Sequence, residues 1–444
     1  MSDRWPAYDR VNVQLGLEAW LGEDGRSHQL VGIVGTRHTE FDLGTLSQTM
    51  AQPWAPRAGS VTIDVLPAGP NGETVSCIQA GLYLVEDSEG RCAVLVLVSE
   101  SHGPRPEGVS IQVVSPDGAR SARSLEAIRA ATLAHNVFRG QVVVFGGEMF
   151  HGSGALLSFE RRPHLRRHEL VLPDGVLEAV ERQVIGIAEH RAALQALGQH
   201  LKRGILLHGP PGTGKTHTVR YLLGRLEGVT VVLLSGESLG MLEAACSVAR
   251  VLQPSVVVVE DVDLIAEERT HYTGVQPMLF ELLNEMDGLG EDVDVAFVLT
   301  TNRPDLLEPA LAARPGRVDQ AVEIPLPNAE ARRRLMELYR GSMNLELADT
   351  SSIVERMEGV TASFVKELLR RSALEALEAR GVPGGGDGQA VAADLVVADA
   401  DVNQALDELL SDRNRLTRVM LGGEPAQSVS PGLENGDEGD RIAR

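Results

Sequence analysis

The sequence predicts an α/β fold built on a parallel sheet with a phosphate-binding loop (P-loop), preceded by an α+β domain. Two observations carry this prediction. A glycine-rich segment, 209–216, lies between an apolar run at 204–208 and a helical pattern at 217–226. Farther along the chain, the β-branched run 255–259 has the continuous apolar character of a parallel strand that is buried on both faces.

The glycine-rich segment matches the pattern G-x-x-x-x-G-K-[S/T] in full. Gly212 and Gly214 leave room for backbone N–H groups to surround phosphate oxygens, and the following helix adds the positive end of its dipole. Lys215 is placed to reach the β- and γ-phosphates, and the hydroxyl of Thr216 is a magnesium ligand. The sequence therefore predicts a site for a nucleoside triphosphate. Its expected residues are Gly209, Pro210, Pro211, Gly212, Thr213, Gly214, Lys215, Thr216 and His217.

Composition limits the remaining possibilities. With 444 residues the chain has room for two to four domains. The 41 basic and 62 acidic residues give a net charge of 41 − 62 = −21, which disfavours non-specific binding of nucleic acid or of an anionic membrane. Cys77, Cys92 and Cys246 show no C-x-x-C spacing, so we expect buried or half-buried thiols in a reducing compartment. No signal peptide or membrane-length apolar run is evident, and we expect a soluble, cytoplasmic protein.

The segment 1–170 predicts an α+β domain of unassigned role, either in recognition or in regulation. A helical pattern at 124–135 interrupts short β-type runs with turn residues between them. Trp5, Trp20 and Trp54 are expected in the core or on a domain face, with a ligand pocket as the alternative. The β-type runs are 30–34, 61–66, 82–85, 93–98, 109–114 and 141–145.

A basic segment at 161–168 then marks the expected linker to the next domain. It is either a solvated connector or a contact with the acidic surface of a neighbouring subunit. A helical stretch follows from about residue 172 to residue 201. Residues 184–187 within it either contact a nucleotide base or pack against a neighbouring helix.

The strand at 255–259 ends in Glu260 and Asp261. Ligands of open α/β sheets bind at the carboxyl edge of the strands, so these two carboxylates are expected at the phosphate site. The alternative is an acidic surface turn. A packed helix at 279–286 and a strand at 295–299 lead on to Asn302.

From about 172 to 410 the chain resembles the AAA+ ATPases of the AAA branch. The resemblance rests on five motifs in a fixed order, and it implies a P-loop NTPase parallel-sheet domain over 171–327 and a small helical lid over 328–421. The composition of 422–444 predicts a disordered tail. The motifs are GPPGTGKT at 209–216, NEMDG at 284–288, TNRPD at 301–305, EPAL at 308–311 and RPGRVD at 314–319.

The resemblance also implies roles for single residues. Glu260, with Thr216, takes the Mg²⁺ position of a Walker B strand, and Asp261 takes the position of the catalytic base. Asn302 is similar to the sensor-1 residue, which holds the attacking water or the γ-phosphate. Arg314 and Arg317 match the arginine fingers that reach a neighbouring subunit's site. Two further positions, Ile185 and Ser363, are similar to those that lie near the base.

Three departures from the family pattern qualify these roles. The usual Asp-Glu order at the end of the strand is reversed, so the base is one methylene shorter and slow hydrolysis is expected. The first pore loop, 237–243, lacks an aromatic residue, which leaves Leu239 and Met241 as substitutes and Tyr272 for a second loop. One extra residue lies between Asn302 and Arg314.

The sequence thus predicts a Mg²⁺-dependent ATPase that assembles as a homo-hexameric ring and remodels or unfolds a protein partner, which the N-terminal domain recognises. The alternative is a nucleotide-switched oligomeric scaffold with little threading activity. Remodelling of nucleic acid is disfavoured by the net charge. No His-Glu-x-x-His motif indicates a fused zinc protease, and the final residues lack the docking motif of proteasomal ATPases.

Overall fold

The computed structural model describes residues 1–35, 42–44, 56–99, 108–146, 157–264, 277–288, 290, 293–307, 317–381 and 395–411. The chain forms two compact units. The first comprises Met1–Leu170, Gly175–His208 and Lys215–Glu323, and the second comprises Val171–Asp174, Gly209–Gly214 and Ile324–Arg444. The expected tail at 422–444 lies outside the described residues.

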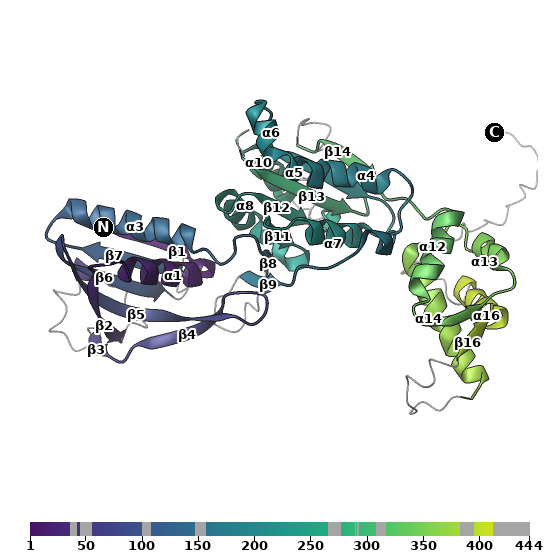
Figure 1. Cartoon of the computed structure of the whole chain (residues 1–444), viewed down its shortest axis with the longest axis horizontal. Helices are drawn as coiled ribbons and strands as arrows, with labels where there is room; N and C mark the ends of the chain where they lie inside the picture. Colours follow the sequence, from purple (N-terminus) through teal and green to yellow (C-terminus); the bar gives the residue numbers. More distant parts are fainter. Residues whose placement is uncertain are drawn as a thin grey trace, which may run out of the picture. The chain divides into compact units, whose positions relative to one another are not determined.

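The N-terminal part is an antiparallel sheet with the strand order β1-β7-β6-β5-β2-β3, and β4 pairs with β5 (Figure 1). Each of the six β-type runs that the sequence predicts coincides with a strand, although the runs 61–66 and 141–145 start one residue before β4 and β8. The strands of this sheet are β1 (Ser2–Pro6), β2 (Ser27–Val34), β3 (Arg57–Gly59), β4 (Thr62–Pro67), β5 (Thr74–Asp87), β6 (Gly90–Ser99) and β7 (Gly108–Val114).

Two helices, α1 (Arg10–Leu21) and α3 (Gly118–Ala134), lie side by side against this sheet (Figure 1). Asp117 caps α3, since its side chain accepts a hydrogen bond from the N–H of Ala119. Trp20 is buried in the core between helices and sheet, and Trp5 is half-buried against it. These two tryptophans are core aromatics, as predicted, whereas Trp54 lies outside the described residues.

The central sheet has the strand order β14-β10-β13-β12-β11-β8-β9, and every pair is parallel except β8 with β9. Strands β8 and β9 come from the segment that the sequence assigns to the N-terminal domain, so this sheet begins before the predicted boundary at residue 170. The strands are β8 (Val142–Phe145), β9 (Leu157–Glu160), β10 (Arg203–His208), β11 (Thr230–Leu234), β12 (Ser255–Val259), β13 (Val295–Thr301) and β14 (Gln320–Glu323).

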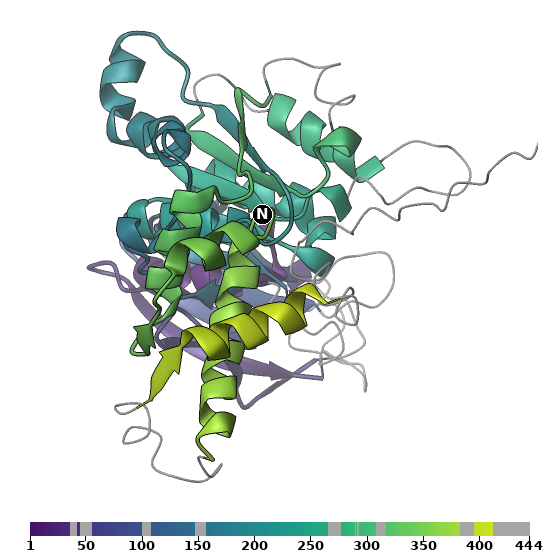
Figure 2. The ribbon, with the colours of Figure 1, turned by 90° about the vertical axis from the view of Figure 1, so that its right-hand side faces the viewer.

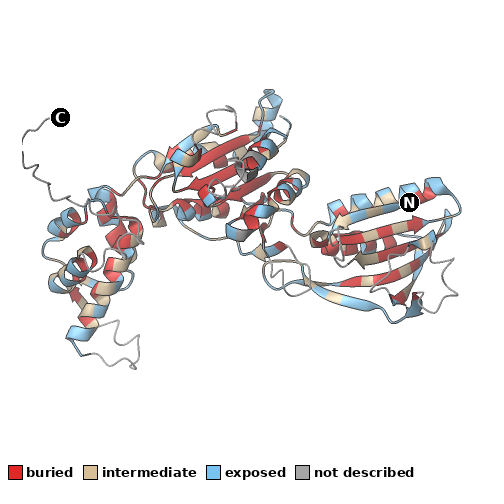
Figure 3. Ribbon diagram, turned by 180° about the vertical axis from the view of Figure 1, so that it is seen from behind, coloured by how far each residue is buried: buried red, intermediate tan, exposed pale blue. Residues whose placement is uncertain are grey.

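The central strands are buried along their length, which Figure 3 shows in red. All five residues of β12 and all seven of β13 are buried, as the continuous apolar pattern of β12 predicts. Residues of η4, α8 and α10 pack with the strands in one hydrophobic core. The helices of this region are α7 (Lys215–Arg225), η4 (Gly236–Met241), α8 (Leu242–Val251), α10 (Pro277–Asp287) and, ahead of β10, α4 (Val176–Glu181), η3 (Arg182–Gly186), α5 (Ile187–Glu189) and α6 (Arg191–Ala196).

The second unit is mainly helical, and Figure 2 shows the yellow helix α16 lying across the green helix α14. Asn328 and Thr361 cap α12 and α14 through their side chains, which accept from the N–H groups of Ala331 and Phe364. A helical region after the central sheet is therefore confirmed. Its elements are α12 (Ala329–Tyr339), β15 (Asn344–Glu346), α13 (Thr350–Arg356), α14 (Ala362–Ala379), β16 (Val396–Ala398) and α16 (Asp399–Leu410).

The basic segment at 161–168 is partly engaged within its own chain. The guanidinium of Arg162 donates to the carbonyls of Leu223, Gly140 and Val229, at 2.6 to 3.0 Å. Arg167 pairs with acidic residues of α4. Arg162 therefore ties the connector to the central sheet, which neither reading of the segment foresees.

Two simpler expectations can be compared directly with the structure. The three cysteines are free and buried, as predicted. Among the described residues no helix is both long enough and apolar enough to cross a membrane.

Candidate functional site

The glycine-rich loop joins β10 to α7, the connection that the sequence predicts. Gly209 has φ 145° and Gly212 has φ 77°, both in the region that favours glycine. A Cβ on Gly209 would collide with the carbonyl oxygen of Ile324. The hydroxyl of Thr213 closes the turn by donating to the carbonyl of Pro210, at 2.9 Å. The loop is thus a tight backbone turn that opens a helix, which is the arrangement that binds phosphate.

Lys215 is the first residue of α7, and its side chain is buried. Burial lowers the pKa of its ammonium group to about 8, because a desolvated charge is disfavoured. The carboxylates of Asp261 and Asp263 oppose this effect and raise the pKa. A cation held in a dry site beside a phosphate-binding turn is well placed to bind an anion.

Glu260 and Thr216 form the second part of the site. Burial raises the pKa of the Glu260 carboxyl, and a hydrogen bond from the Thr216 side chain lowers it. Oε1 of Glu260 is buried and has no hydrogen-bond partner among the described residues. A buried, unpaired carboxylate oxygen next to a hydroxyl matches the oxygen ligands that Mg²⁺ prefers.

The described residues contain no group of three or more His, Cys, Asp or Glu side chains that could hold a metal ion by themselves. That finding agrees with the usual chemistry of Mg²⁺, which binds one or two protein oxygens and completes its shell with phosphate and water. Glu260 and Thr216 therefore fit Mg²⁺ only together with a bound phosphate.

Asp261 and Asn302 meet at the carboxyl edge of the sheet, as the sequence predicts. Nδ2 of Asn302 donates to Oδ1 of Asp261 at 3.2 Å. The backbone of Asp261 has φ 52°, a strained value for a residue other than glycine, and its N–H donates to Oγ1 of Thr300 at 3.0 Å. The turn thus fixes the exposed carboxylate of Asp261 beside the side-chain amide of Asn302.

Asp263 is a further site residue, for which the sequence analysis assigned no role. Its buried carboxylate accepts from Oγ1 of Thr301 at 2.9 Å and from the N–H of Asn302 at 3.1 Å. It therefore holds the backbone that carries Asn302. The signal in the sequence was a third carboxylate two positions after Asp261, with an apolar residue between them.

The residues expected near the base come from different elements of the chain. Ile185 is buried in the π-helical turn η3, a helix form that is common at functional sites. The N–H and Oγ of Ser363 both donate to the carbonyl of Gly212, at 3.3 and 3.4 Å, so this residue contacts the phosphate loop directly. His217 is exposed in the first turn of α7. The contacts of Ile185 and Ser363 with a base, and of His217 with the bound nucleotide, stay predictions.

Arg317 differs from the expectation of a finger that projects from its own subunit. Its side chain is buried, and its Nε donates to Oδ1 of Asp287 at 2.7 Å, with a second bond from Nη2 to Oδ2. The bidentate pair with Asp287 and the burial of the guanidinium keep it inside its own chain. Arg314 lies outside the described residues, and its finger role stays a prediction.

The first pore loop is also different from the expectation. Its residues form the short helix η4 and the start of α8, where Leu239 is buried and Met241 is half-buried against the core of the central sheet. Leu239 is therefore not exposed to grip a polypeptide, and Met241 is exposed only in part. Tyr272 lies outside the described residues.

Comparison with known proteins matches residues 205–326 to the model of the "ATPase family associated with various cellular activities (AAA)". The chain is 34% identical over 236 residues to the 26S proteasome regulatory subunit 8 homolog of Schizosaccharomyces pombe, covering 48% of this chain and 58% of the relative. It is 30% identical over 241 residues to the proteasome-activating nucleotidase of Thermococcus onnurineus, covering 51% and 60%.

A third relative, the proteasome-activating nucleotidase of Pyrococcus furiosus, is 27% identical over 285 residues, covering 61% of this chain and 68% of the relative. For the first two relatives the chain spans less than two thirds of their own length. The matched family segment contains the parallel sheet from β10 to β14, the glycine-rich loop, the two acidic residues at the end of β12 and Asn302. Residues 205–326 of this chain therefore form a domain of the AAA family of ATPases, homologous to the proteasomal regulatory ATPases.

Proposed function

We propose that this protein hydrolyses ATP to ADP and phosphate with the help of Mg²⁺. The observation that carries the proposal is the buried, unpaired oxygen of Glu260, which lies beside the Thr216 hydroxyl at the end of the phosphate loop. A carboxylate in that state needs a cation to compensate its burial. Mg²⁺, when bound with ATP, supplies charge neutralisation for the phosphates.

Within this proposal each residue has one task. The N–H groups of the loop and the ammonium group of Lys215 bind and orient the phosphates. Glu260 and Thr216 hold the metal. The carboxylate of Asp261 accepts a proton from water, and the side-chain amide of Asn302 fixes that water and the γ-phosphate in place. The hydrogen bond between Asp261 and Asn302 supports this division, since it places the two side chains within reach of a single water molecule.

The test of the hydrolysis step is Asp261→Asn, which keeps the shape of the side chain and removes the base. ATP turnover should fall about 100-fold or more, because general base catalysis contributes at least that much, while binding of a fluorescent ATP analogue is retained. Asp24→Asn, at an exposed turn after α1, is the matched control and should leave turnover unchanged. Unaltered turnover in Asp261→Asn would refute the assignment.

We further propose that the protein acts as a ring, by homology a homo-hexamer, on a protein partner that the N-terminal domain selects. The names of the relatives connect them with the proteasome, and the sequence match to them supports an energy-dependent role in protein remodelling. Arg314 would then reach the neighbouring subunit's γ-phosphate. This explains why hydrolysis should depend on assembly.

A second candidate function is a nucleotide-switched scaffold that assembles without threading a polypeptide. The position of Leu239 in the core, with Met241 half-buried against it, favours it, since a pore loop grips through exposed side chains. ATP turnover measured across protein concentration, with and without an unfolded model polypeptide, separates the two. Turnover that rises with both supports remodelling, whereas ATP-dependent assembly with negligible turnover supports the scaffold.

A further inference from the structure

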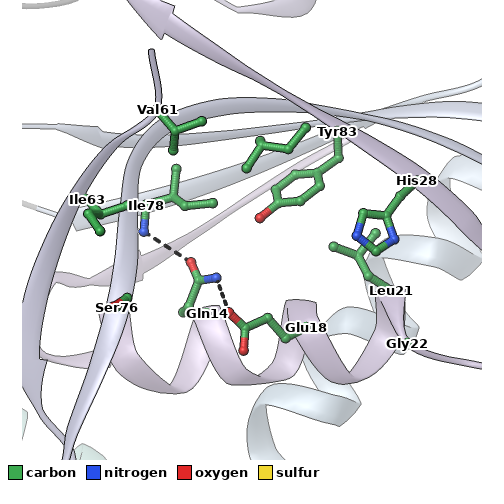
Figure 4. A pocket seen from close by; sticks show the side chains of 11 residues that line it. Gln14, Glu18, Leu21, Gly22, His28, Val61, Ile63, Ser76, Ile78 and Tyr83 are labelled. Carbon is green, nitrogen blue, oxygen red and sulfur yellow. Dashed lines mark hydrogen bonds between the residues drawn. The ribbon is translucent and has the colours of Figure 1, made fainter.

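A cavity of about 350 Å³ lies in the N-terminal sheet domain, and none of its lining residues belongs to the site described above. Figure 4 shows it between α1, the strand β5 and the strands β2 and β4. The register between β4 and β5 shifts at Thr62 and Ile63. Opposite this shift, the N–H of Ile78 donates to Oε1 of Gln14 at 3.2 Å, so α1 supplies the floor of the cavity. The volume is in the range of ligand pockets.

The walls of the cavity near β4 are apolar and open to solvent. Ile63 is 53% exposed and Val61 is 36% exposed, although both are large apolar side chains. Among the described strands β4 pairs only with β5, so the backbone N–H and C=O groups of its other edge have no strand partner in the described part of the chain. An open edge with apolar side chains is the kind of surface to which an extended polypeptide adds as a further strand.

The charge at the floor of the cavity is negative. Glu18 is exposed there, and its Oε1 accepts a hydrogen bond from Nε2 of Gln14 at 2.6 Å. It lies in the C-terminal half of α1, whose last turn holds no basic residue, so the negative end of the helix dipole adds to its charge. The nearby cation Arg26, shortly after α1, forms an ion pair with Asp87 and donates a hydrogen bond to the carbonyl oxygen of Trp20. In the described part of the chain Glu18 forms no ion pair.

Aromatic rings complete the cavity on the side of β2 and β5. His28 and Tyr83 have ring centroids 5.9 Å apart, with planes inclined by 60°. Both rings line the cavity, and Figure 4 shows them on the side opposite Gln14 and Ile63. The face of a tyrosine ring attracts a cation through its quadrupole. Carboxylate, helix end and ring therefore all favour a positively charged group.

We propose that this cavity binds a basic side chain, Lys or Arg, carried by an extended polypeptide segment that lies along β4. The aliphatic stem of that side chain packs against Val61 and Ile63, and its charged end reaches Glu18. The inference needs no ATP hydrolysis, so it stands or fails independently of the proposed function.

Fluorescence anisotropy of the full-length protein without nucleotide tests this proposal. The probe is a labelled peptide, Gly-Val-Thr-Lys-Val-Thr-Gly, and its partner peptide has norleucine in place of Lys. The Lys peptide should bind about fivefold more tightly than the norleucine peptide, which is the worth of one partly exposed ion pair. Glu18→Gln, which keeps the hydrogen bond to Gln14, should abolish that preference. Asp24→Asn is the matched control and should preserve it.

Two further measurements test whether the apolar wall and the peptide backbone contribute to binding. Ile63→Ser should lower the affinity for both peptides, because Ile63 contacts the aliphatic stem and the peptide strand and does not contact the charged group. Free n-hexylamine should bind more weakly than the Lys peptide, since it makes no backbone contact with β4. Equal affinity for the two peptides, a Lys preference that survives Glu18→Gln, or binding of hexylamine without binding of the peptide would each overturn the proposal.

Discussion

At the scale of single residues, the candidate site is held together by hydrogen bonds between side chains and backbone at the carboxyl edge of the sheet. Asp263 accepts from both Thr301 and the N–H of Asn302, and Asp261 accepts from the side chain of Asn302. The position of the Asn302 amide therefore depends on two carboxylates. One of them is exposed and the other is buried.

Asp263→Ala should lower kcat about tenfold or more by releasing Asn302 from its position. It should also lower the melting temperature, because two buried donors lose their acceptor at about 1–3 kcal/mol each. Asp263→Asn keeps an acceptor oxygen and should restore most of kcat. Steady-state ATPase kinetics and thermal melting of the three proteins measure both effects. Equal kcat in all three would show that Asp263 does not position Asn302.

Glu260→Gln should raise the Mg²⁺ concentration for half-maximal ATP turnover by about tenfold, since a neutral amide oxygen is a weaker ligand for a hard cation. The measurement is a Mg²⁺ titration of ATPase activity at fixed ATP. Glu189→Gln, on the exposed surface of α5, is the control and should keep the wild-type titration. A Glu260→Gln protein with an unchanged Mg²⁺ requirement would contradict the assignment of this residue as a metal ligand.

At the scale of elements, α1 shows why the sequence predicted some elements and missed others. Val11, Val13, Leu15 and Leu17 alternate with polar or small residues, a period that is typical of a strand. The segment is nevertheless a helix, because its polar residues are also buried and bonded. Oδ1 of Asn12, for instance, accepts from the N–H of Val137 at 2.9 Å. Contacts 125 residues apart in the chain override the local pattern, and no window of sequence contains them.

Asn12→Leu should therefore destabilise the N-terminal domain, although it increases apolar content and improves the local helix propensity. The N–H of Val137 loses its acceptor, at a cost of about 1–3 kcal/mol. Urea unfolding followed by tryptophan emission measures this domain alone, because all three tryptophans lie within the first 54 residues. An unchanged or higher unfolding midpoint would contradict the role of Asn12.

The long helix α14 provides a prediction for pH. Hydrogen bonds from Arg370 and Arg371 lower the pKa of Glu367 from 4.5 to about 2. A carboxyl whose pKa is depressed on folding stabilises the fold fully above pH 4.5 and progressively less as the pH falls towards 2. The difference in melting temperature between the wild type and Glu367→Gln should thus be larger at pH 6 than at pH 3.5. A difference in melting temperature that grows on acidification would contradict the predicted stabilisation by the ionised Glu367.

At the scale of the whole molecule, the sequence predicted the parallel sheet from local patterns and the helical region from the family resemblance. β12, β13 and α7 begin and end close to the predicted residues. The first strand of the central sheet could not be predicted, because the run 141–145 indicates a strand but does not indicate which sheet that strand joins. The buried position of Arg317 was likewise unpredictable, since its partner Asp287 lies 30 residues away.

Strands β8 and β9 predict where the chain can be cut to give a stable fragment that contains the central sheet. A fragment that begins at residue 137 keeps β8 and its parallel pairing with β11 over 142–144. A fragment that begins at 171 loses both strands and exposes the apolar edge of β11. The longer fragment should therefore melt at a higher temperature and aggregate less, as calorimetry and light scattering can measure. Equal stability of the two fragments would show that β8 and β9 are dispensable for the central sheet.

The contact between Ser363 and the phosphate loop has a structural consequence. A single carbonyl, that of Gly212, accepts both donors of Ser363, and the segment Gly209–Gly214 packs as part of the helical unit. The same segment is covalently continuous with β10 on one side and α7 on the other. The glycine-rich loop is therefore covalently part of the path between β10 and α7 and is also hydrogen-bonded to the first turn of α14.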